Sequence, residues 1–100
     1  GESVSLERGQ EAARHCALNI LAQAKAALDG DLTRIRRLLK LTVFVASTPS
    51  FTDQHKVANG ASDLLVELLG DIGKHSRSAV GVPALPMGAA VEIEAVFEIA

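Results

Sequence analysis

The sequence predicts an α+β fold in which two helices pack on one face of a β-sheet. Two segments repeat apolar residues at three- and four-residue steps, and three others are rich in β-branched residues, in the order α-β-α-β-β. At 100 residues, without repeats or a low-complexity linker, the chain has the length of a single domain covering residues 1–100. With three phenylalanines and no tryptophan or tyrosine, its core is expected to be aliphatic.

The first predicted helix covers residues 6–28, and Ser5 is a suitable N-cap. One face repeats apolar residues at helical spacing: Ala13, Cys16, Ala17, Ile20, Leu21, Ala24 and Leu28. The Asp29-Gly30-Asp31 turn ends the helix. Because Cys16 lies on this face, we expect a small core residue rather than a nucleophile. A single cysteine excludes an internal disulfide and is typical of a reducing compartment.

A strand is predicted over residues 36–45, apolar on both faces towards its end, which is typical of the interior of a sheet. Pro49 interrupts this pattern. The second helix follows, with an apolar stripe formed by Val57, Ala61, Leu64, Leu65, Leu68 and Leu69. It is expected to end at Gly70 or Gly73.

Two closing strands are predicted over residues 76–82 and 90–99, joined by a turn that contains Pro and Gly. Arg77 lies on the first strand, and carboxylates alternate along the second. A guanidinium holds a planar carboxylate through two parallel hydrogen bonds, and a nearby glutamate can orient or activate water. Arg77 and Glu94 therefore indicate a site for a small carboxylate-bearing molecule. The alternative is a structural ion pair from Arg77 to Glu92 or Glu94 across adjacent strands.

Composition disfavours several classes of partner. The net charge of -2 gives no general attraction for nucleic acid or an anionic membrane. No apolar run reaches membrane-spanning length and no secretory signal opens the sequence, so we expect a cytoplasmic protein without a membrane partner. His15, His55 and His75 are too scattered for a metal site, and His75 is expected in an exposed loop. Ser78 lacks the base that a hydrolytic triad requires.

Six motifs follow one another at characteristic spacing: Gln10 with Asn19-Ile20, Lys40-Leu41-Thr42-Val43-Phe44-Val45, Phe51 with Asn59, Arg77-Ser78, Leu85-Pro86 and Val91-Glu92-Ile93-Glu94-Ala95. In this order they resemble the YjgF/RidA family of reactive-intermediate deaminases, whose members are also named L-PSP endoribonucleases or translation inhibitors. The resemblance extends over essentially the whole chain.

This resemblance implies a chorismate-mutase-like fold and a homotrimer with a central barrel and ligand clefts between subunits. It implies hydrolysis of 2-imino or enamine acids to 2-keto acids and ammonia, without a metal or organic cofactor. By position, Arg77 would clamp the substrate carboxylate and Glu94 would hydrogen-bond the attacking water. Asn59 and Ser78 would contribute to substrate binding. Because an imine is already electrophilic, the protein mainly has to orient it beside water.

The chain also departs from the family pattern. The Gly-Pro-Tyr and Ser-Gly-Gln segments that open family members are absent, so we expect the N-terminal strands to be missing. Ala79 stands where many members have cysteine, and His75-Ser76 replaces a Pro-Ala pair. The segment from Phe51 to Asn59 is longer by about one turn. These differences indicate a divergent branch and leave two alternatives: a non-catalytic metabolite-binding or regulatory trimer, and an endoribonuclease or translation inhibitor, which the scarcity of stacking aromatics disfavours.

Overall fold

The computed structural model describes residues 5–47 and 51–100. Within these residues the elements are, in order, α1 (Leu6–Ala27), β1 (Ile35–Ala46), α2 (Gln54–Leu69), β2 (Ser76–Val82) and β3 (Val91–Ile99). The predicted order is confirmed, and the predicted bounds of the first helix and the strands agree to about one residue. Ser5 caps α1 as expected, because its Oγ accepts a hydrogen bond from the Arg8 N–H at 3.2 Å. The predicted interruption at Pro49 lies outside the described residues.

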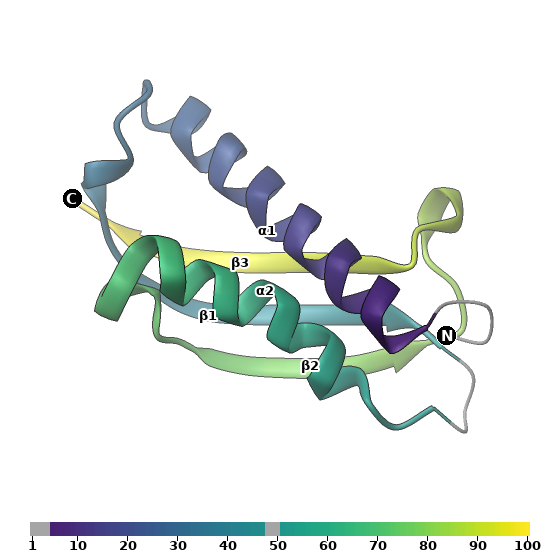
Figure 1. The fold of residues 1–100 in the computed structure, drawn as a ribbon. Helices are drawn as coiled ribbons and strands as arrows, with labels where there is room; N and C mark the ends of the chain where they lie inside the picture. Colours follow the sequence, from purple (N-terminus) through teal and green to yellow (C-terminus); the bar gives the residue numbers. More distant parts are fainter. Residues whose placement is uncertain (1–4, 48–50) are drawn as a thin grey trace.

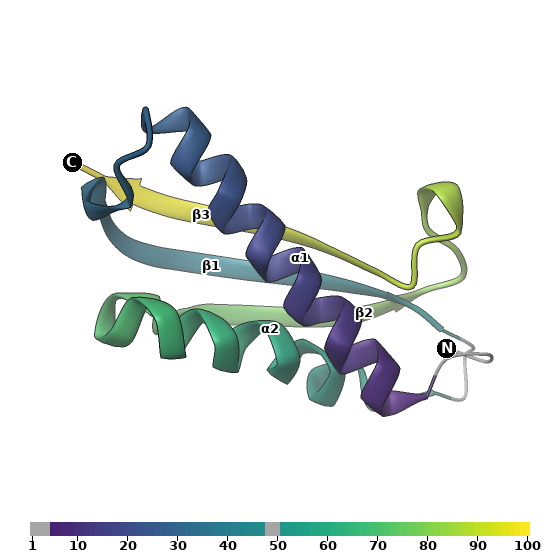
Figure 2. The ribbon, with the colours of Figure 1, turned by 45° about the horizontal axis from the view of Figure 1, so that its top comes forward.

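Both helices lie on the same face of the sheet (Figures 1 and 2). The strand order is β2-β1-β3, with β1 parallel to β2 and antiparallel to β3. A parallel pair requires a crossover connection, which α2 provides between β1 and β2. The opposite face of the sheet, called the open face below, carries no helix from the described residues. This two-layer arrangement confirms the predicted fold class.

The two closing strands are not neighbours, because β1 lies between them. The segment that joins them passes the end of β1, where the Ala46 N–H donates to the Ala90 carbonyl and the Ser47 N–H donates to the Val82 carbonyl, each at 2.9 Å. Pro and Gly residues indicate a turn, but they do not determine whether the two strands that it joins are neighbours or have a third strand between them. The alternative of an ion pair across adjacent strands is therefore wrong for Arg77.

Two register irregularities in β1 keep its large apolar side chains against the helices. Ile35, Leu38 and Leu41 are all buried although they are spaced three residues apart, whereas a regular strand would alternate their faces. The register with β3 shifts between Ile35 and Arg37 and again between Leu38 and Lys40. Each shift is a bulge-type irregularity that returns the next large residue to the covered face.

The central position predicted for β1 is confirmed, but only one of its faces is fully covered in the single chain. Leu41 and Val43 are completely buried against the helices. Thr42 and Phe44, which alternate with them, are half-buried on the open face. The sequence pattern alone indicated burial on both faces.

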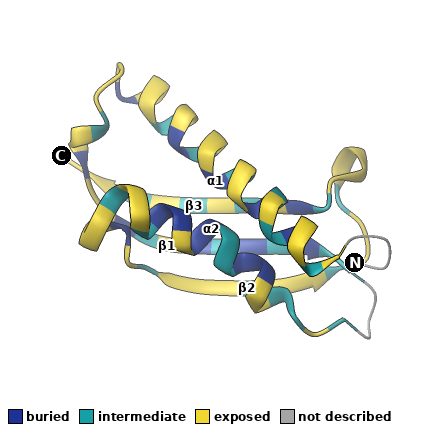
Figure 3. Cartoon of the chain, in the orientation of Figure 1, coloured by how far each residue is buried: buried dark blue, intermediate teal, exposed yellow. Residues whose placement is uncertain are grey.

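The core is aliphatic, as expected, and lies between the helices and the sheet (Figure 3). It comprises Ala13, Ala17, Leu21, Leu38, Leu41, Val43, Val45, Val57, Ala58, Ala61, Leu64, Leu65 and Val91. The helices approach closely at Gly60, where an added Cβ would lie 2.2 Å from the Gln10 carbonyl oxygen. Leu68, expected on the apolar stripe of α2, is 53% exposed. No helix in the described ranges has both the length and the hydropathy needed to cross a bilayer.

Candidate functional site

Arg77 projects from β2 on the face of the sheet that the helices cover. In the sheet register it is paired with Leu41 of β1, and Leu41 is paired in turn with Ala95 of β3. Residues paired in this way share one face, and Leu41 is buried against the helices. Since β2 is an edge strand, Arg77 reaches α2 while much of its side chain stays exposed.

Two neutral side chains of α2 hold the Arg77 guanidinium. Its Nη1 donates to Asn59 Oδ1 at 2.8 Å and to Ser62 Oγ at 3.1 Å. The structure thus brings together Arg77 and Asn59, two of the predicted site residues. The ion pairs found within the described ranges join Lys56 to Asp53 and Lys74 to Asp71. No carboxylate from these ranges neutralises Arg77.

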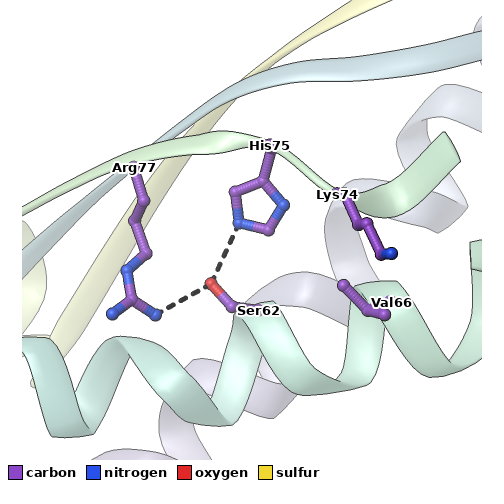
Figure 4. A pocket seen from close by; sticks show the side chains of 5 residues that line it. All are labelled: Ser62, Val66, Lys74, His75 and Arg77. Atoms are coloured by element: carbon purple, nitrogen blue, oxygen red, sulfur yellow. Dashed lines mark hydrogen bonds between the residues drawn. The ribbon is translucent and has the colours of Figure 1, made fainter. Parts of the chain in front are cut away.

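A solvent-open pocket of about 240 Å³ lies beside this arginine, between α2 and the start of β2. Its lining residues are Ser62, Val66, Lys74, His75 and Arg77 (Figure 4). Two basic side chains, of which Lys74 is paired with Asp71, lie around this volume together with an imidazole and a hydroxyl. Such a lining favours an anionic group over a neutral one.

His75 lies in the loop just before β2, as expected, but it is half-buried in this pocket rather than exposed. Its Nε2 lies 3.0 Å from Ser62 Oγ, and its Nδ1 lies 2.5 Å from the Gly73 carbonyl oxygen. His75 directly precedes β2, and its side chain meets Ser62 of α2, as that of Arg77 does. Among residues 5–47 and 51–100, no three His, Cys, Asp or Glu side chains are grouped to hold a metal ion.

Ser62 belongs to the site but was not predicted from the sequence. It is the one polar residue buried in the described part of the chain, with 9% of its surface exposed. A signal was present, because Ser62 lies four residues after Ala58 and three before Leu65, within the buried face of the helix. A buried hydroxyl requires hydrogen-bond partners, and here both come from the β2 region.

Glu94 and Ser78, the other predicted site residues, lie on the open face. Both are paired with Thr42, whereas Arg77 is paired with the preceding residue of β1, Leu41. Because successive side chains of a strand point to opposite faces, those of Glu94 and Ser78 point away from the helices. Glu94 also contributes to a hollow of about 590 Å³ between α1 and β3. Within a single chain, therefore, Glu94 and Ser78 do not share the pocket of Arg77.

Cys16 lies in α1, remote from this pocket, and is half-buried beside β3. Its Sγ is 3.6 Å from the Val91 carbonyl oxygen. Burial raises the pKa of the Cys16 thiol, and the negative charge of Glu92 raises it further. A protonated thiol is a poor nucleophile, which agrees with the packing role expected for this residue.

A model of the family described as "YjgF/chorismate mutase-like, putative endoribonuclease" matches residues 1–98. The chain belongs to this family. Among YjgF-like structures, it superposes with a TM-score of 0.93 on that of a "putative endoribonuclease" from Shewanella oneidensis, with 32% identity over 99% of this chain and 65% of that one. The likeness therefore covers the whole described fold.

Two further relatives are more similar in sequence. A crystal structure of a protein of unknown function from Agrobacterium tumefaciens is 56% identical, with a TM-score of 0.95 over 96% of this chain and 61% of that one. The Trypanosoma cruzi protein named "Protein TCP17" is 55% identical over 100 residues, which cover 99% of this chain and 62% of that protein. The chain thus spans less than two thirds of the length of each relative.

Proposed function

We propose that the pocket binds a small carboxylate-bearing metabolite through Arg77. The single observation that supports this most strongly is how the guanidinium is held. Both of its hydrogen bonds to described residues leave from Nη1, so its Nε and Nη2 N–H groups make none within the described ranges. These two groups form one edge of the guanidinium, and an edge of this kind binds a carboxylate through two parallel hydrogen bonds.

The reaction we propose at this site is hydrolysis of a 2-imino or enamine acid. Water adds to the imine carbon, the carbon–nitrogen bond breaks, and a 2-keto acid and ammonia leave. Arg77 would fix the carboxylate, and Asn59 would keep the guanidinium in its orientation through the 2.8 Å hydrogen bond. Positioning accounts for most of such catalysis, because the imine carbon is already electrophilic.

In this proposal Glu94 orients the water, and it must come from a second copy of the chain. Its side chain lies on the open face, opposite to Arg77. A cleft between subunits would bring Glu94 of one copy to Arg77 of another, in the homotrimer with a central barrel that the resemblance implies. The exposed apolar side chains of the open face, Val80 at 43% and Val96 at 52%, support an interface there.

The test measures turnover and binding separately. Arg77→Gln is expected to abolish hydrolysis of 2-aminoacrylate-like imines and to weaken binding of 2-ketobutyrate by roughly 30-fold, because a hydrogen-bonded charge contributes about 2 kcal/mol. Arg14→Gln, on the exposed surface of α1, removes the same charge and is the matched control. Glu94→Gln is expected to lower turnover while 2-ketobutyrate binding is retained.

Each outcome has a defined reading. Binding of 2-ketobutyrate that depends on Arg77, without imine hydrolysis, would replace the deaminase by a metabolite-binding or regulatory trimer. Equal binding and turnover in the wild type and Arg77→Gln would overturn the proposal as a whole. If turnover falls as much in Arg14→Gln as in Arg77→Gln, the loss is due to the change in net charge and not to a specific role of Arg77.

A second candidate is RNA cleavage, which the description of the family names. The observation that favours it is the joint presence of Lys74, His75 and Arg77 in one pocket, since cations bind phosphate and an imidazole transfers protons. The net charge of -2 and the lack of tryptophan and tyrosine speak against an extended RNA surface. Cleavage that persists through repeated purification and disappears in Arg77→Gln would establish it.

A further inference from the structure

Ser62 and His75 form a hydrogen-bonded pair that carboxylate binding by Arg77 does not require. Ser62 Oγ lies 3.0 Å from His75 Nε2, and both side chains line the pocket (Figure 4). A serine inside a helix usually bonds its own backbone one turn earlier or points to solvent. The hydrogen bonds recorded for Ser62 instead run across to His75 and Arg77.

For a neutral imidazole, the partners of this pair determine the direction of each hydrogen bond. The Gly73 carbonyl can only accept, so the nitrogen 2.5 Å from it, His75 Nδ1, carries the proton. In the neutral ring His75 Nε2 then has a lone pair and accepts from the Ser62 hydroxyl. Arg77 Nη1 donates to the same Ser62 oxygen at 3.1 Å. The hydroxyl proton is thus directed at a base, while a cation lies next to the oxygen.

Gly73 is held in place as the group that orients the imidazole. It is buried at the end of the turn Gly70–Gly73, where an added Cβ would lie 2.6 Å from the Leu65 carbonyl oxygen. Close packing against α2 therefore fixes the Gly73 carbonyl and, through it, the tautomer of His75. Nucleophile, base and orienting group follow one another as in enzymes that form acyl intermediates.

We propose that Ser62 is a nucleophile activated by His75, and that this pocket hydrolyses small carboxylic esters through an acyl-serine intermediate. Val66 supplies an apolar wall for the acyl group. The guanidinium of Arg77 lies beside Ser62 Oγ, so in this proposal its positive charge stabilises the oxyanion that the ester carbonyl oxygen becomes after attack.

The reaction proceeds in two balanced halves. Ser62 Oγ forms a bond to the ester carbon, its proton passes to His75 Nε2, and the carbonyl electron pair becomes the oxyanion. The bond to the leaving oxygen then breaks, and the alcohol departs with the proton from His75. Water, deprotonated by His75, attacks the acyl-serine, and the carboxylic acid leaves as Ser62 recovers its proton. The only co-reactant is water.

The first experiment treats the protein with methanesulfonyl fluoride, a small reagent for activated serines, and maps the adduct by peptide mass spectrometry. Modification of the wild type at Ser62 is expected, with none in Ser62→Ala and a rate at least 100-fold lower in His75→Gln. Ser76→Ala and His15→Gln alter exposed residues outside the pocket and should react like the wild type. An adduct at another residue, or none, overturns the proposal without requiring any variant to fold.

The second experiment measures hydrolysis of p-nitrophenyl acetate above the uncatalysed rate. His75→Gln is expected to lower this rate by between about 100-fold and 10,000-fold. Rates that are equal in the wild type, Ser62→Ala and His75→Gln would overturn the proposal. Binding of 2-ketobutyrate should weaken only about 5-fold in Ser62→Ala, as in Asn59→Ala, because one of the two acceptors of Arg77 Nη1 is lost while the Nε–Nη2 edge remains. A loss of binding as large as that in Arg77→Gln, together with unchanged ester hydrolysis, would assign Ser62 to holding Arg77 rather than to nucleophilic attack.

Discussion

The two faces of the sheet differ in what their side chains contact. On the covered face, Leu41 and Val43 are completely buried, and at the β2 edge the same face ends in the polar cluster of Arg77, Ser62 and His75. On the open face, Thr42 and Phe44 alternate with those core residues but stay half-exposed. The covered face therefore provides both the stability of the single chain and a preformed pocket.

This contrast shows why a strand residue cannot be assigned to a site by its chemical type alone. Arg77 and Glu94 are both charged residues on neighbouring segments of sequence, yet the register places them on opposite faces. A substitution on the covered face should change the stability or the pocket of the single chain. A substitution on the open face should change the contacts between chains in the proposed assembly.

The largest effect is expected from a charge on the open face. Val80→Lys would place an ammonium group within the proposed interface, where burial of an unpaired charge is strongly unfavourable. We expect the proposed homotrimer to dissociate while the circular dichroism spectrum of the chain is retained. Sedimentation velocity at micromolar concentration checks this. A wild type that is already monomeric would contradict the assembly, and an intact Val80→Lys trimer would place its interface elsewhere.

Identical truncations on the two faces should differ in their effect on stability. Val43→Ala removes two buried carbon atoms and leaves a cavity, so we expect the free energy of unfolding to fall by about 2–3 kcal/mol. Val96→Ala, at a position 52% exposed in the single chain, should change it by less than about 0.5 kcal/mol at concentrations where the protein is monomeric. Urea unfolding at several protein concentrations measures both. Equal losses of unfolding free energy in the two variants would contradict the expected difference in burial between the two faces.

A smaller effect is expected from Asn59→Ala within the polar cluster. The variant removes one of the two acceptors that hold Arg77 Nη1, so the guanidinium loses orientation but keeps its charge. We expect 2-ketobutyrate to bind roughly 5-fold more weakly, since a hydrogen bond of this kind contributes about 1 kcal/mol. Isothermal titration calorimetry measures this change. A loss as large as that of Arg77→Gln would instead make Asn59 a direct ligand contact.

The smallest effect concerns Cys16, beside β3. Burial and the charge of Glu92 raise the pKa of its thiol, so the reactive thiolate is scarce below that pKa and increases as the pH rises. At pH 8 we expect Cys16 to react with iodoacetamide more slowly than free cysteine, and Glu92→Gln to accelerate the reaction slightly. Mass spectrometry of timed samples follows both rates. Faster alkylation than that of free cysteine would contradict the burial of this thiol.

The sequence predicted those parts of the fold that depend on local patterns. Alternation and helical spacing placed the first helix and the three strands to about one residue, because burial imposes these periods directly. Strand order was not accessible in this way. The Pro83 and Pro86 region has the composition of a turn whether or not β1 lies between the strands that it joins.

The site was predicted in part. Arg77 was predicted from the chemistry of its guanidinium and from a family motif, Asn59 from a family motif alone, and the two side chains meet at 2.8 Å. Ser62 was missed because one hydroxyl on an apolar stripe gives no indication of its partner. His75 was expected to be exposed, because its burial depends on how the turn Gly70–Gly73 packs against α2. Such contacts arise between different elements of structure, and the periodicity of one element does not predict them.

The most direct test of carboxylate binding by Arg77 is a crystal structure of the protein with 2-ketobutyrate. We expect the ligand in the pocket beside α2, with its carboxylate bound to the Nε and Nη2 groups of Arg77 by two parallel hydrogen bonds. A keto acid that occupies the hollow between α1 and β3 instead, with no contact to this guanidinium, would contradict the assignment.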